Sequence, residues 1–115
     1  EESFEGKEKI EIMSKSEIKE GKASICCTLE DNIKRLYEIN IEKVLLTSSG
    51  NKNMIIKITD ELLLEKTGGI IQGMSGSPII QEGKLVGAVT HVFLNDPTRG
   101  YGVFIENMID DMNKF

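Results

Sequence analysis

Short runs of alternating apolar and polar residues, separated by turn-forming residues, extend along most of this chain. Such alternation is typical of β-strands with one buried face, and Gly, Asn, Asp and Pro between the runs favour turns. The pattern predicts strands over residues 9–13, 22–29, 33–39, 41–47, 54–58, 79–81, 84–94 and 101–105. Residues 33–39 and 41–47 form either two strands or one long bent strand. Many short strands at regular spacing indicate an all-β barrel or sandwich.

Two segments depart from this alternation and predict short helices. Residues 60–66 hold three successive leucines, and Thr59 or Asp60 precedes them in a position suited to capping a helix N-terminus. Residues 106–113 have an amphipathic pattern and come last in the chain. We therefore expect a β structure that ends in a short C-terminal helix.

Length and charge narrow the classes of function. The 115 residues are enough for one small domain, or part of one, with a modest core. The net charge of −5 comes from 14 basic and 19 acidic residues spread along the chain, which argues against nucleic-acid binding because that needs a basic stripe. No apolar run approaches the roughly 18 residues of a membrane span, and we expect no signal peptide.

The two cysteines, Cys26 and Cys27, are adjacent on a predicted strand. Neighbouring strand residues point to opposite faces, and a bond between them would be strained. We therefore expect one core and one surface cysteine. The sequence has no CxxC pattern and no Cys/His ligand set, so we expect no metal site and no other cofactor.

The segment Gly-Met-Ser-Gly-Ser-Pro, from Gly73 to Pro78, carries the strongest chemical signal. A nucleophilic serine needs a tight loop that turns backbone N–H groups toward the attacked carbonyl oxygen, and glycine permits such bends. Ser75 is the candidate nucleophile, with the N–H groups of Gly73 and Ser75 as the candidate oxyanion hole, where each donor contributes about 10²–10³ in rate in studied enzymes. Taken alone, these residues favour an ordinary turn between strands, because Gly/Ser loops are common.

Two other classes of site do not match the sequence. Gly68-Gly69 lacks the GxxxxGK pattern of a phosphate-binding loop, which leaves a hinge or a part in the oxyanion loop. An α/β-hydrolase would place its serine within a parallel βαβ pattern, and none surrounds Ser75. Tyr101 and Phe104 are expected in the barrel core.

The order of features around Ser75 closely resembles the SpoIVB peptidase family, which belongs to the chymotrypsin-like clan. The resemblance is specific over residues 68–80, GGIIQGMSGSPII, and 87–106, which contain GAVTHVFLNDPTRGYGVFIE; residues 18–25 and 37–44 also match. It implies that residues 1–115 are the C-terminal part of a serine peptidase domain. The implied fold is the C-terminal, antiparallel chymotrypsin-like β-barrel with a short terminal helix.

The resemblance also implies roles for further residues. Asp60, in Lys-Ile-Thr-Asp-x-Leu-Leu, corresponds to the third catalytic residue of the family, while its alternative role is to cap the helix. Thr90, His91 and Val92 fall on the strand that lines the substrate cleft. The family's general base is a histidine in an upstream Gly-His-Gly-Ile-like motif, which this chain lacks; since the one histidine, His91, lies on the cleft strand, we expect the chain alone to be inactive.

The function implied is that of a sporulation signalling endopeptidase. Such an enzyme cleaves itself and a membrane-associated regulatory protein between forespore and mother cell, which leads to activation of a late sigma factor. The family implies an exported, membrane-associated parent protein in the forespore intermembrane space, with a PDZ domain upstream. The alternative is a non-catalytic β-barrel module with a peptide groove along residues 87–94. Open strand edges would also permit a strand-swapped dimer.

Overall fold

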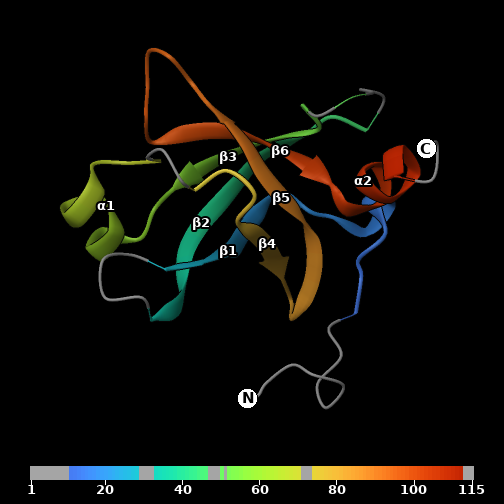
Figure 1. Ribbon diagram of the computed structural model, residues 1–115, viewed down its shortest axis with the longest axis horizontal. Helices are drawn as coiled ribbons and strands as arrows, with labels where there is room; N and C mark the ends of the chain where they lie inside the picture. Colours follow the sequence, from blue (N-terminus) through green and yellow to red (C-terminus); the bar gives the residue numbers. More distant parts are fainter. Residues whose placement is uncertain (1–10, 29–32, 47–49, 51, 71–73, 113–115) are drawn as a thin grey trace.

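The chain folds into a closed antiparallel β-barrel with the strand order β1-β2-β3-β6-β5-β4 (Figure 1). The computed structural model describes residues 11–28, 33–46, 50, 52–70 and 74–112. The strands are β1 (Gly21–Thr28), β2 (Lys34–Val44), β3 (Met54–Ile58), β4 (Pro78–Gln81), β5 (Lys84–Val92) and β6 (Arg99–Phe104). A 3₁₀ turn, η1 (Lys15–Glu17), and two helices, α1 (Glu61–Thr67) and α2 (Ile105–Met112), complete the described elements. This confirms the predicted all-β, chymotrypsin-like barrel with a short C-terminal helix.

The structure selects one of the two alternatives predicted for residues 33–47 and shortens another predicted strand. Residues 33–47 contain one long strand, β2, whose pairing with β3 shifts register between Ile41 and Lys43. The extra residue at this bulge bends the strand, which allows one strand to follow the curved barrel wall. Of the strand expected at residues 9–13, the described part forms a single bridge between Ile12 and Leu85, because the chain turns into η1 directly afterwards.

The core is formed by the inward-facing residues of each strand. Fully buried side chains recur at every second position, as at Ile39 and Ile41 on β2 and at Met54, Ile56 and Ile58 on β3. Burying each such aliphatic side chain stabilises the fold by about 1.5–3 kcal/mol. The alternation thus sets the register of the barrel, because a slip by one residue would expose the whole apolar face.

The adjacent cysteines behave as predicted. Cys27 is buried and Cys26 is half-buried, and both are free thiols. Burial raises the pKa of the Cys27 thiol, with the neighbouring Cys26 as a second cause. Cys27 is therefore a structural position on β1 and not a reactive thiol.

The strand pairings bring the functionally interesting segments to one end of the barrel. Lys57 near the end of β3 lies opposite Arg99 at the start of β6, and Val92 at the end of β5 lies opposite Gly100. Pro78 at the start of β4 lies opposite Ala88 on β5. The start of α1, the loop that carries Ser75 and the β5–β6 connection therefore share this end.

Candidate active site

The hydroxyl group of Ser75 is exposed and donates a hydrogen bond of 3.0 Å to the backbone carbonyl oxygen of Thr90. The loop around it is held by backbone bonds: Gly76 N–H donates to the Val89 carbonyl at 2.7 Å, and Ser77 N–H donates to the Met74 carbonyl at 3.0 Å. Gly76 has a φ of 90°, a left-handed conformation that favours glycine. The loop therefore presents Ser75 to solvent against β5.

Met74, which precedes the candidate nucleophile, anchors the loop in the core. Its side chain is only 3% exposed and belongs to the main apolar cluster, whereas Ser75 next to it is exposed. On the other side of Ser75, the Ser77 carbonyl accepts a 3.0 Å bond from Val89 N–H. The buried Met74 side chain on one side of Ser75 and the Ser77 backbone bond on the other limit the positions that the Ser75 hydroxyl can reach.

Thr90 lies where β5 departs from regular pairing. The register between β5 and β6 shifts between Val89 and His91, so that Thr90 is the additional residue of a bulge. Its hydroxyl donates to the Tyr101 carbonyl oxygen at 3.3 Å, which ties the bulge to β6. Bulges commonly re-aim groups beside active sites. Here the carbonyl of Thr90 faces Ser75, and the structure brings these two predicted site residues together.

Asp60 caps the N-terminus of α1, as its alternative role predicted. Its Oδ1 accepts a 3.1 Å bond from Leu63 N–H, and its Oδ2 accepts a 3.1 Å bond from Glu38 N–H. Its own N–H donates to the Glu38 carbonyl at 2.9 Å. The carboxylate is thereby clamped between α1 and β2 at the barrel end that also carries Ser75. Its catalytic role stays a prediction.

The predicted oxyanion hole is described in part. Ser75 belongs to the described residues, while Gly73, the other expected donor, lies outside them. The loop entering this segment is docked on the β5–β6 connection, because Ile70 N–H donates to the Pro97 carbonyl at 2.7 Å. A Cβ at Gly69 would lie 2.4 Å from the Pro97 carbonyl oxygen, so only glycine permits this approach. Gly69 therefore serves loop docking, whereas Gly68, with a φ of 76°, is the left-handed C-cap of α1.

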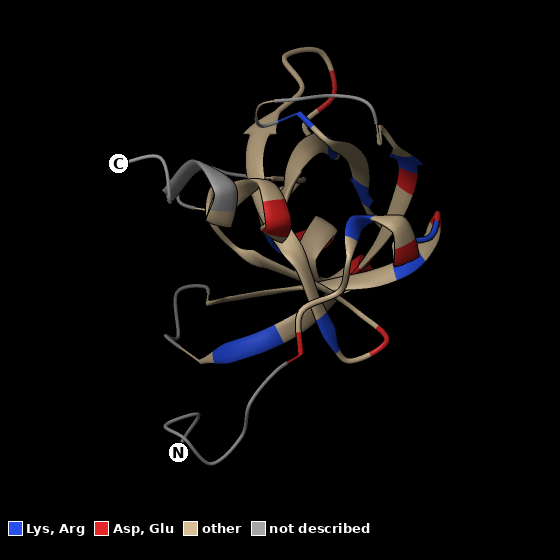
Figure 2. Cartoon of the chain, turned by 90° about the vertical axis from the view of Figure 1, so that its right-hand side faces the viewer, with Lys and Arg blue, Asp and Glu red and all other residues tan. Residues whose placement is uncertain are grey.

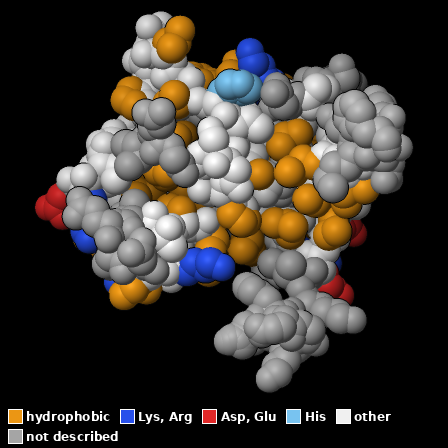
Figure 3. All heavy atoms as spheres, in the orientation of Figure 1, with side chains coloured by type: hydrophobic (Ala, Val, Ile, Leu, Met, Phe, Trp, Pro, Cys, Tyr) orange, Lys and Arg blue, Asp and Glu red, His pale blue; other side chains and the backbone are white. Residues whose placement is uncertain are grey.

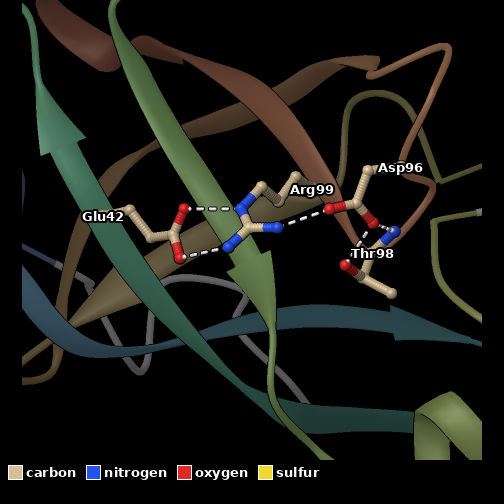
Figure 4. Close-up of polar contacts among 4 residues, drawn as sticks. All are labelled: Glu42, Asp96, Thr98 and Arg99. Carbon is tan, nitrogen blue, oxygen red and sulfur yellow. Dashed lines mark hydrogen bonds and ion pairs between the residues drawn. The ribbon is translucent and has the colours of Figure 1, made fainter.

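The β5–β6 connection is itself fixed by an ion-pair network (Figure 4). Arg99 donates from Nε and Nη2 to the two carboxylate oxygens of Glu42, at 2.8 and 3.1 Å, and from Nη1 to Asp96 at 2.5 Å. The Thr98 hydroxyl donates to Asp96 Oδ1 at 2.6 Å. The Arg99 hydrogen bonds lower the pKa of Glu42, and the Thr98 hydroxyl, followed by Arg99, lowers the pKa of Asp96.

The described hydrogen bond of the serine hydroxyl is to the Thr90 carbonyl and not to His91. His91 pairs with Tyr101 and lines a pocket of about 430 Å³. The pocket is lined by Lys52, His91, Val92, Phe93, Leu94, Asn95 and Tyr101. Sequence analysis placed Tyr101 in the barrel core, which is wrong, because its ring faces this pocket; Phe104, fully buried, is the core residue expected.

Lys52 is a pocket residue that sequence analysis missed. A single lysine between two predicted strands carries no signal, because its relation to Tyr101 depends on the pairing of β3 with β6. Within the described ranges, no group of three or more His, Cys, Asp or Glu residues could hold a metal ion. No helix among the described residues has the length and apolar character to cross a membrane.

Comparison with known proteins assigns the chain to a group of enzymes. The family model described as SpoIVB peptidase S55 matches residues 1–109. No curated protein and no solved structure matches the chain. The match covers the serine loop, α1, β5 and β6, which together form the candidate site.

Proposed function

This chain belongs to the SpoIVB peptidase S55 family, and we propose that it is the part of a serine endopeptidase that carries the nucleophile, Ser75. The observation that carries this proposal is the exposed Ser75 hydroxyl, held 3.0 Å from the Thr90 carbonyl beside the end of β5. An exposed serine on a tight, doubly anchored loop can meet a peptide carbonyl without rearrangement of the barrel. Family membership supplies the reaction, hydrolysis of a peptide bond.

In the proposed reaction, Ser75 Oγ forms a bond to the scissile carbonyl carbon while its proton passes to a general base. The Thr90 carbonyl accepts a hydrogen bond but is far too weakly basic to take that proton. The hydroxyl must therefore turn from Thr90 toward an imidazole. We assign that base to a histidine-bearing segment of the longer protein, since His91 faces the neighbouring pocket.

The negative charge that develops on the carbonyl oxygen needs donors aimed at it. The N–H groups of Gly73 and Ser75 are the proposed donors. Thr90, His91 and Val92 are the proposed substrate-binding residues, where an extended peptide would lie beside the end of β5. When the peptide binds, its own N–H groups compete with Ser75 for the Thr90 carbonyl, which frees the hydroxyl for attack.

Asp60 remains the proposed third catalytic residue. An ionised carboxylate has about four lone-pair sites on its two oxygens. Backbone N–H groups of Leu63 and Glu38 occupy one site on each oxygen. An additional bond to a histidine N–H is therefore chemically compatible with the capping role, and the cap would then hold the carboxylate in place.

The biological role proposed from family membership is proteolytic signalling during sporulation. The parent enzyme would cleave itself and a membrane-associated regulator between forespore and mother cell, upstream of late sigma-factor activation. We also propose export, membrane association and an upstream PDZ domain for the parent protein. The described strands close into a ring with paired edges, so a strand-swapped dimer would require the barrel to open; the dimer stays a prediction.

Self-cleavage of the parent protein tests the proposal. Ser75→Ala should abolish self-cleavage while leaving the fold intact, because an exposed loop hydroxyl contributes little to packing. Ser77→Ala, two residues along the same loop, should retain it. Processing of Ser75→Ala at the wild-type rate would instead favour the alternative, a peptide-binding barrel without catalysis.

A further inference from the structure

The pocket beside the serine loop combines positive charge with an aromatic and apolar surface. It lies between the β2–β3 connection, which supplies Lys52, and the end of β5 with the residues that follow it. Among the described residues, its lining includes Lys52 and His91 and no Asp or Glu, although the chain as a whole has a net charge of −5. Figure 3 shows the histidine at the surface next to a basic side chain and several apolar ones. Figure 2 shows that the positions of acidic and basic residues alternate along the described ribbon.

Lys52 is held at the pocket by its neighbour in the chain. Asn53 is fully buried, and its Oδ1 accepts bonds from Phe104 N–H at 2.9 Å and from Asn107 Nδ2 at 3.2 Å. Asn53 N–H also donates to the Gly102 carbonyl at 2.9 Å. The backbone beside Lys52 is therefore fixed, and the lysine ammonium lies 5.2 Å from the centre of the Tyr101 ring.

The other lining residues form an apolar boundary. The rings of Phe93 and Tyr101 pack at a centroid distance of 4.9 Å. Leu94 is 97% exposed, which leaves a large apolar side chain at the rim without burial in this fold. Exposed apolar surface marks interaction sites. A cationic group beside it complements a partner with an acidic head and an aliphatic stem. A glutamate side chain has this chemistry.

The pocket is continuous with the candidate active site through the backbone of β5. Thr90 accepts the Ser75 hydroxyl bond, and the next two residues, His91 and Val92, line the pocket. An extended peptide lying beside these residues directs alternate side chains to the same face. A peptide seated at Ser75 therefore brings side chains near Lys52.

We propose that this pocket selects substrates by receiving an acidic side chain of the bound peptide, with Lys52 as the charge that recognises it and Tyr101 and Phe93 as the surface against which its stem packs. The proposal rests on the proposed function, because it takes the bound peptide to be the substrate. Exposed ion pairs are weak and sensitive to salt, so the expected preference for an acidic side chain is about three- to fivefold in affinity.

The test measures binding to the Ser75→Ala chain, so that no step of catalysis is required. The probes are short alanine-based peptides, acetylated and amidated, with one Glu placed at each position in turn and a Gln twin for each. Affinity is read by NMR from the ring signals of His91, which are unambiguous because the chain has one histidine. Lys52→Gln tests the pocket, and Lys84→Gln at the opposite end of β5 is the matched control for net charge.

We expect at least one Glu peptide to bind about three- to fivefold more tightly than its Gln twin. Lys52→Gln should remove that preference and Lys84→Gln should keep it. Equal affinity for all twins, failure of both twins to bind, or a preference that survives Lys52→Gln would overturn the proposal. Labelling of Ser75 in the parent enzyme is an independent measurement. A labelled Ser75 without a preference for Glu peptides overturns only the proposal for the pocket. A preference for Glu peptides without labelling of Ser75 overturns only the assignment of Ser75 as the nucleophile.

Discussion

The Ser75 hydroxyl and the Thr90 carbonyl oxygen are joined by a 3.0 Å hydrogen bond between a loop and a strand bulge fifteen residues apart in the chain. The bond links the group that would attack a substrate to the strand that would bind it. Because the acceptor is a carbonyl, the serine is positioned but not activated. Activation then depends on a base and on the release of the hydroxyl from Thr90.

The first prediction concerns the 115-residue chain by itself. It should hydrolyse no peptide, because His91 faces the pocket with Lys52 and the serine faces a carbonyl. Incubation with a broad peptide mixture and mass spectrometry checks this. Turnover that exceeds the Ser75→Ala variant would show that His91, or a second copy of the chain, supplies the base.

Two substitutions separate the roles of Asp60. Asp60→Ala should lower the free energy of unfolding by about 1 kcal/mol or more, since it removes the helix cap and the acceptor for Glu38 N–H. Asp60→Asn keeps an acceptor oxygen for the cap and should cost less. Chemical denaturation gives both values.

The same Asp60→Asn variant, placed in the parent enzyme, tests catalysis. If Asp60 orients the base, self-cleavage should fall by orders of magnitude in this folded variant, because loss of the carboxylate favours the wrong histidine tautomer. Self-cleavage at the wild-type rate in folded Asp60→Asn would assign the residue to capping alone.

The Glu42–Arg99–Asp96 network predicts how the free energy of unfolding depends on pH. Arg99 and Thr98 hold the pKa values of the two carboxylates below their ordinary values of 4.5 for Glu42 and 3.8 for Asp96. A folded-state pKa that is lowered contributes stability above the unfolded pKa, and this contribution is lost as the pH falls through the folded value.

Unfolding measured from about pH 6 down to about pH 2.5 should therefore show a loss of stability that begins below the ordinary pKa of Glu42. The loss should be smaller in Arg99→Gln, which removes the partner of both carboxylates, although that variant is less stable near neutral pH. The same acid dependence in both proteins would contradict this account of the network.

Any side chain at Gly100 should destabilise the barrel. A Cβ there would lie 2.5 Å from the His91 carbonyl oxygen and 2.7 Å from Ile70 Cδ1. Gly100→Ala should lower the free energy of unfolding by about 1–3 kcal/mol, as overpacking does in other cores. Gly68→Ala is the comparison, because a Cβ at Gly68 meets open space and its cost comes from a φ of 76° alone; equal or greater destabilisation by Gly68→Ala would contradict the packing argument.

Much of the barrel is predictable from sequence because its strands have one buried face. The buried residues Tyr37, Ile39 and Ile41 of β2 alternate with polar residues in the sequence, and the cap at Asp60 follows from local chemistry. Local patterns also located Ser75. The bulge at Thr90 could not be predicted in this way, since it depends on how β5 meets β6.

Contacts between side chains on distant strands could not be predicted from sequence for the same reason. The buried Asn53 is a polar residue between two predicted strands, yet it binds the backbone at Phe104 and the side chain of Asn107 on α2. That contact fixes Lys52 beside Tyr101, so the pocket results from long-range pairing and leaves no local motif. The missed residues are therefore those whose role depends on a distant strand.

The central claim is that Ser75 is the nucleophile, and covalent labelling tests it most directly. The parent protein, with its histidine-bearing segment, is treated with a serine-directed phosphonate, and the site of the adduct is mapped by mass spectrometry. We predict an adduct on Ser75, no adduct in Ser75→Ala, and undiminished labelling in Ser77→Ala. An adduct on another residue, or labelling that persists in Ser75→Ala, would contradict the account.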